Sequence, residues 1–248
     1  MAWLGLGVFY TGAIVGIPVV TGVAQGVQQQ KQANADAANQ DRMIKFYMDV
    51  FCAADSKFKD EVHGTMIVLK HDKVWLAPKD PETLLPLPLK DAPAPHAFAG
   101  FYIQYPDDDR SPAQLGMVST ISVDPPMLNW IYVDKNTFEL RYGNRSQSIE
   151  HLVGPWDWTE DEVGVTLDGW EGFVVVEEEE KEDGLKWALY YDQWDDDFGN
   201  GRKVGGRNRL QCSLERRVLP DELRKAQELA AEKKMQVKSS GDLKTQWG

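Results

Sequence analysis

Between residues 61 and 217 the sequence consists of short segments in which apolar and polar side chains alternate. A period of two is typical of β-strands, and turn residues such as His71-Asp72 and those at 134–137 separate the segments. The run GTMIVLKHDKVWLAP predicts a hairpin around His71-Asp72. Further strands are expected at 98–105, 115–123, 128–133, 138–143, 163–167, 171–179, 185–193 and 207–217. Many short strands with little helix between them favour a mostly antiparallel β-barrel or sandwich.

The composition supports a real hydrophobic core in this β-rich region. Hydrophobic residues make up 42% of the chain, which argues against global disorder. Tryptophans lie in or beside the expected strands, at 75, 130, 170 and 187, and we expect them in the core rather than on a ligand platform. The proline-rich stretch at 77–97 is predicted to be an extended arm lying on its own domain, because proline cannot donate to a sheet ladder.

The first 28 residues carry no charged side chain. The run is long enough to cross a bilayer as a helix, but it is rich in glycine, and small residues one turn apart let helices pack closely. We therefore expect self-association through these residues: Gly5, Gly12, Ala13, Gly16, Gly22 and Gly26. Three burials remain open for this segment, namely a bilayer, the core of a homo-oligomer, or a groove of its own domain. No basic residue precedes the run, which disfavours a secretory signal.

Helical segments are predicted on both sides of the β-region, giving an α+β protein overall. Gln- and Ala-rich sequence leads into MIKFYMDVFCAAD, where apolar residues recur at helical spacing, so we expect one helix from about 21 to 54. Pro220 and Asp221 begin a C-terminal helix that Gly241 ends. The expected parts are a Gly-rich apolar helix, a helical stalk, an acidic β-rich domain and a C-terminal helix with its tail: 1–27, 28–57, 58–218 and 219–248.

The net charge limits the partners. It is −12 at pH 7, and the acidic excess lies between residues 43 and 220. Such a surface repels nucleic acid and anionic lipid headgroups. Cys52 and Cys212 are too few for a disulfide framework and fit a reducing compartment, although a single bridge stays open. We expect an intracellular protein, either cytoplasmic or membrane-associated.

Part of the β-region resembles a known family. The runs LNWIYVDKNTFELRYGNR, LVGPWDWT, DGWEGFV and WALYYD, within about 128–193, are similar to a pattern of uncharacterised proteins from filamentous fungi. The resemblance implies a fungal origin and no known activity.

Chemical motifs are sparse. The four histidines have no paired metal-ligand spacing, and no nucleophile elbow or phosphate loop is present. No organic cofactor is expected. A bound calcium ion is the one alternative that stays open, and calcium prefers oxygen ligands. The acidic loop after the 185–193 strand supplies the candidate ligands Asp192, Asp195, Asp196, Asp197 and Asn200. Residues 177–180, four consecutive glutamates, are predicted to be a solvated charge run.

These features predict a self-associating structural or scaffold protein, non-enzymatic, that assembles with itself through its N-terminal helix, with filaments as one form. The first alternative is a β-barrel that binds a small ligand and is tethered to a membrane, since an eight-stranded barrel has room for one. The second is an enzyme, for which no catalytic residue can be named.

Overall fold

The computed structural model describes residues 41–53, 55–107, 109–123, 126–200, 204–221 and 225. The chain divides into two units, 1–40 and 41–248, and the described residues all belong to the second. The apolar helix at 1–27, its glycines, the start of the stalk and nearly all of the C-terminal helix lie outside the described residues.

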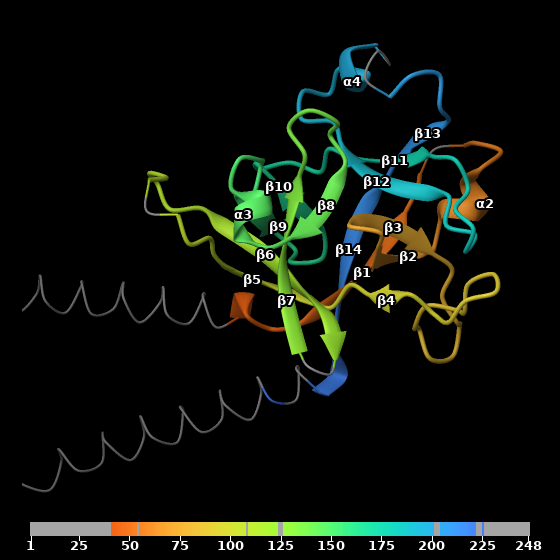
Figure 1. The fold of residues 1–248 in the computed structure, drawn as a ribbon, viewed down its shortest axis with the longest axis horizontal. Helices are drawn as coiled ribbons and strands as arrows, with labels where there is room; N and C mark the ends of the chain where they lie inside the picture. The colour runs from red at the N-terminus through yellow and green to blue at the C-terminus, as the bar shows by residue number, and fades with distance from the viewer. Residues whose placement is uncertain are drawn as a thin grey trace, which may run out of the picture. The chain divides into compact units, whose positions relative to one another are not determined.

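The second unit is built mostly of antiparallel strands with three short helices among its described residues (Figure 1). The strands are β1 (Phe46–Phe51), β2 (Met66–Lys70), β3 (Lys73–Ala77), β4 (His96–Ala97), β5 (Gly100–Gln104), β6 (Leu115–Val123), β7 (Pro126–Val133), β8 (Leu140–Gly143), β9 (Trp156–Trp158), β10 (Val165–Leu167), β11 (Phe173–Glu177), β12 (Trp187–Tyr191), β13 (Arg209–Gln211) and β14 (Ser213–Val218). The helices are α2 (Lys59–Val62), α3 (Arg145–Ser148) and α4 (Asp197–Asn200). The antiparallel β-fold expected from the alternating segments is confirmed.

The strand pairings form a closed circuit. Each member pairs with the next in the order β3, β8, β7, β6, β5, β1, β2 and back to β3. β12 and β11 extend the sheet from β3, β14 pairs with β1 along its whole length, and β9 and β10 form a separate pair. Such a circuit favours a barrel over a sandwich, because a sandwich keeps its two sheets separate.

Local turn chemistry explains the hairpins that the sequence predicts. His71 and Asp72 join β2 to β3 and have φ of 52° and 57°. Two consecutive residues with positive φ form the kind of turn that matches the twist of the strands in a two-residue hairpin. Between β7 and β8, the Asp134 carboxylate accepts hydrogen bonds from the backbone N–H groups of Asn136 and Thr137 at 2.9 and 3.2 Å.

The expected helix up to residue 54 is wrong from Phe46 to Phe51, which form β1. Phe46, Met48 and Val50 are fully buried, and this spacing of two fits a strand as well as the helical spacing read from the sequence. The strand pairs with β14, more than 160 positions further along the chain. This distant partner decides the structure, because a short apolar run is ambiguous by periodicity alone.

A large hydrophobic core joins most of the strands, and a second, smaller cluster lies apart from it. The largest fully buried side chains of the large core include Trp75, Trp156 and Tyr190. The proline-rich segment is held against this body, since Lys79 Nζ lies 2.8 Å from Asp49 Oδ2 on β1 and the Lys90 N–H donates to the Asp183 carbonyl.

Candidate binding cleft

A surface cleft of about 650 Å³ lies where β1, β11, β13 and β14 end. Its apolar lining consists of Phe173, Val174 and Cys212 together with two further aromatic residues, Phe51 and Trp170. The remaining side chains around it are polar or small: Ala53, Glu171, Asp192, Asp195, Gln211 and Ser213. The volume is within the range of about 300–1,000 Å³ typical of small-molecule sites.

A tight turn positions Trp170 in this cleft. Asp168 and Gly169 adopt φ of 53° and 86°, and the backbone N–H groups of Leu167 and Trp170 donate to each other's carbonyl oxygens at 3.1 and 3.3 Å. Asp-Gly is the pair that favours a turn of this kind. Beneath the indole lies Gly172, at which an added Cβ would come within 2.8 Å of Trp170 Cη2. The glycine therefore allows the ring to lie against the backbone.

Asp192 is a buried carboxyl group in the cleft wall, only 5% exposed. Its backbone N–H donates to the Gly172 carbonyl at 2.8 Å, which continues the β11–β12 ladder by one residue. The carboxylate accepts the Asp197 N–H at 2.8 Å. Burial raises the pKa of Asp192, with a smaller contribution from the charge of Asp196 and in opposition to the backbone hydrogen bonds.

Glu171 is an exposed carboxylate of the cleft, and its pKa is also raised. Desolvation is the main cause, followed by the charges of Asp161 and Glu215. Those two acids line a neighbouring depression that shares Glu171 and Ser213 with the cleft. Glu171 and Asp192 therefore lie in surroundings that disfavour further negative charge.

The acidic loop predicted to bind calcium is only partly gathered at this cleft. Asp192 and Asp195 line it, whereas Asp197 is paired with Arg209 and Asp196 accepts the Gly199 N–H at 2.9 Å. The Asn200 side chain lies outside the described residues. In the part of the chain that the structure describes, no three His, Cys, Asp or Glu side chains are grouped closely enough to hold a metal ion.

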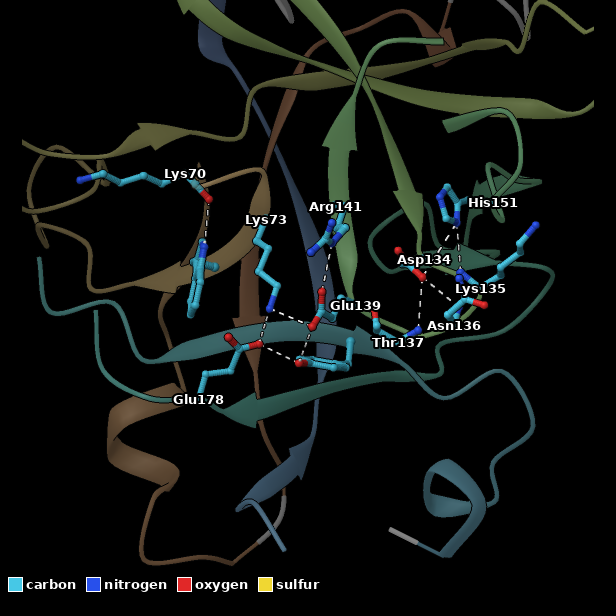
Figure 2. Close-up of polar contacts among 12 residues, drawn as sticks. Lys70, Lys73, Asp134, Lys135, Asn136, Thr137, Glu139, Arg141, His151 and Glu178 are labelled. Atoms are coloured by element: carbon cyan, nitrogen blue, oxygen red, sulfur yellow. Dashed lines mark hydrogen bonds and ion pairs between the residues drawn. The ribbon is translucent and has the colours of Figure 1, made fainter. Parts of the chain in front are cut away.

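A second polar cluster lies between β3, β8, β11 and β12 (Figure 2). Lys73 Nζ lies 2.9 Å from Glu139 Oε1 and 2.6 Å from Glu178 Oε1. The Tyr190 hydroxyl donates to Glu178 Oε1 at 2.7 Å and lies 3.2 Å from Glu139 Oε1. Burial opposes ionisation of Glu139, but Lys73 and Arg141 together hold its pKa below the usual value. Because these side chains satisfy one another, the cluster is a structural link between strands and not a vacant ligand site.

The solvated charge run expected at 177–180 is exposed only at its last two positions. The Glu178 side chain is 10% exposed and is bound by Lys73 and Tyr190, and Glu177 is half-buried and paired with Lys186. In the sequence the four glutamates look alike, and only the neighbouring strands distinguish the first two.

The tryptophans have two different environments. Trp75 and Trp187 are buried in the core as expected, and Trp130 packs against Tyr105. Trp170 is half-buried at the edge of this core, where it packs on Tyr191 and also lines the cleft. The sequence signal for its place near the surface is the Asp168-Gly169 turn immediately before it.

Comparison with known proteins identifies the class. Residues 22–220 match the fungal β-trefoil domain, and the match covers most of the chain. The protein belongs to this family, which confirms the resemblance to a fungal family seen in the sequence. No significant match was found among curated proteins or among solved structures. Within the described residues no helix is long and apolar enough to span a membrane.

Proposed function

We propose that this protein is a non-catalytic binding domain whose cleft beside Trp170 takes a small organic cation, such as a quaternary ammonium compound. The composition of the cleft wall carries the proposal. Three carboxylates (Glu171, Asp192 and Asp195) stand beside two aromatic side chains, and among the described residues that line the cleft there is no lysine, arginine or histidine.

Two physical effects favour a cation at this place. The face of a tryptophan attracts a cation through the quadrupole of the ring, an effect of about 0.5–2 kcal/mol. Desolvation is the main cause of the raised pKa values of Glu171 and Asp192, so their charged forms are disfavoured where they stand. The nearby Arg209 is engaged by the Asp197 carboxylate, and a cation in the cleft would add positive charge beside Glu171 and Asp192. A cation bound in the cleft should lower the pKa values of Glu171 and Asp192. By the same linkage, the cation should bind more tightly as the pH rises through these pKa values.

The test compares choline with 3,3-dimethyl-1-butanol, its uncharged isostere of the same shape, by isothermal titration calorimetry. We expect choline to bind and the isostere to bind at least about tenfold more weakly, which corresponds to 1.4 kcal/mol. Equal affinities would contradict a cation site and would leave a hydrophobic pocket.

Three variants locate the binding. Trp170→Ala removes the aromatic wall and should weaken choline binding about tenfold, while Glu171→Gln removes one charge and should weaken it by a smaller factor. The matched control is Glu150→Gln, because the Glu150 side chain is 78% exposed and lies outside the cleft. If all three variants bind choline as the wild type does, the cation is bound elsewhere.

A second proposed role is self-association through residues 1–27, supported by the uncharged sequence and the spacing of Gly12, Gly16, Gly22 and Gly26. Filaments are one form this would take, if the contact is heterologous. Sedimentation velocity with and without mild detergent separates the cases. An assembly that persists in detergent and is broken by Gly12→Leu or Gly16→Leu supports the role. A species dispersed by detergent indicates a bilayer segment, and a monomer in both buffers contradicts self-association.

A further inference from the structure

The two cysteines of the chain face each other across two paired strands. β1 and β14 are antiparallel, and their register ends with Phe51 opposite Ser213. Continuing that register by one position places Cys52 opposite Cys212. Residues directly opposite in an antiparallel pair have their side chains on the same face of the sheet.

The backbone hydrogen bonds show what kind of pair this is. Val50 exchanges its bonds with Thr65 and Gly64, on the side away from β14. The Cys52 N–H likewise points away, to His63 Nδ1 at 3.2 Å, and the Cys212 N–H donates to the Phe173 carbonyl on β11 at 3.0 Å. Neither N–H is directed at the other strand, so the cysteines form a non-hydrogen-bonded pair.

That kind of pair brings side chains closest together. Its Cα atoms are typically about 4.5 Å apart, which lies within the span of about 4.4–6.8 Å that a disulfide bridges. Cys52 is 1% exposed and Cys212 is 7% exposed. Burial raises the pKa of the Cys212 thiol, and the proximity of Cys52 raises it further. The two sulfurs are thus near neighbours in the reduced protein.

The cleft is the side from which this pair would be approached, because Cys212 lines it and Cys52 does not. A small oxidant in the cleft would therefore react with Cys212 first. Both cysteines are buried, at 7% exposure for Cys212 and 1% for Cys52, and of the two only Cys212 lines the cleft.

We propose that Cys52 and Cys212 are a site of reversible oxidation, forming a cross-strand disulfide by exchange with a small-molecule disulfide such as oxidised glutathione. The Cys212 thiol loses its proton to solvent, and its thiolate attacks the small disulfide and releases one glutathione thiolate. The Cys52 thiol then loses its proton, and its thiolate attacks the Cys212 sulfur of the mixed disulfide and releases the second. Two protein thiols are oxidised, one disulfide is reduced to two thiols, and the released thiolates take up the two protons.

This site goes beyond cation binding and does not depend on it. The bridge would link positions 52 and 212 and so tie together β1 and β14, which lie side by side in the middle of the domain (Figure 1).

The test uses the full-length native protein, incubated at pH 8.5 in a series of oxidised-to-reduced glutathione ratios. Each sample is quenched, unfolded and alkylated with N-ethylmaleimide before intact mass spectrometry. We expect a species that loses both alkylation sites and weighs two hydrogen atoms less than the reduced chain, monomeric on a non-reducing gel, with a linked peptide pair containing Cys52 and Cys212. In urea the same transition should need a more oxidising ratio, because unfolding separates the two thiols.

Two variants assign the order of attack. Cys52→Ser should stop the reaction at a glutathione adduct on Cys212, and Cys212→Ser should leave Cys52 unmodified. Several results would overturn the proposal: both cysteines alkylated in the native protein after days at the most oxidising ratio, glutathione adducts on both without a bridge, or bridging only between chains.

Discussion

At the scale of single residues, Asp183 shows how one carboxylate ties separate turns together. It lies in the 181–184 turn between β11 and β12 and accepts from Lys70 at 2.6 Å and from His71 at 2.9 Å, both at the β2–β3 turn. Burial disfavours its charge, but these two hydrogen bonds and the Leu185 N–H lower the pKa of Asp183 to about 2. Its charge is therefore used to join two hairpins.

We expect Asp183→Asn to reduce the free energy of unfolding at pH 7 by about 2 kcal/mol, the equivalent of a pKa reduced from 3.8 to about 2. Because the folded pKa is the lower one, this stabilisation is present above pH 3.8 and is lost as the pH falls through about 2. Urea unfolding of both proteins between pH 7 and pH 2 measures the difference. If the difference in free energy of unfolding between the two proteins stays constant down to pH 2, the charge of Asp183 is not the source of that difference.

Gly172 is the residue that sets the position of Trp170. In Gly172→Ala the new methyl group would collide with the indole, so the ring should leave the cleft wall and choline affinity should fall about tenfold, as in Trp170→Ala. The control is Gly206→Ala, where a Cβ would have no atom within 4 Å. Calorimetry on both variants measures the effect, and unchanged affinity in Gly172→Ala would mean that the indole does not contact the ligand.

At the scale of elements, turn chemistry was predictable and strand partners were not. The His71-Asp72 hairpin and the 134–137 loop follow from residues that favour left-handed or side-chain-bonded turns. β1 was misread because FYMDVF satisfies both a helical and a strand period, and its partner β14 is far away in sequence. β9 was not expected, since a strand of three residues, Trp156–Trp158, is too short to show a period.

The cluster formed by Lys73, Glu139, Glu178 and Tyr190 links β3, β8, β11 and β12. Lys73→Met should destabilise the domain by about 3 kcal/mol, because it leaves Glu139 and Glu178 mutually repelling in a site where each side chain is under 15% exposed. Lys135→Met is the matched control, since Lys135 is 54% exposed and 3.6 Å from its partner, and it should change stability by no more than about 0.5 kcal/mol. Thermal or urea unfolding distinguishes them, and equal stability of the two variants would contradict the structural role of the cluster.

At the scale of the whole molecule, the candidate cleft could not have been predicted from local sequence. Its lining comes from residues 51–53, 170–174, 192–195 and 211–213, and the pairings of β1 with β14 and of β11 with β12 and β13 bring these segments together. The acidic loop was recognised as unusual from its composition, but its link to Trp170 depends on the β11–β12 register. The strong negative charge of the chain, −12, then gives a cation a favourable approach to this surface.

The most direct test of a cation site at Trp170 is a ¹⁵N spectrum of the indole N–H groups during titration. The chain has nine tryptophans, and the Trp170 signal is assigned by its loss in Trp170→Phe. We expect this signal to shift with choline and to stay in place with 3,3-dimethyl-1-butanol, while the signals of the buried Trp75 and Trp156 do not move. An unmoved Trp170 signal at saturating choline, or equal shifts with both compounds, would contradict the cation site.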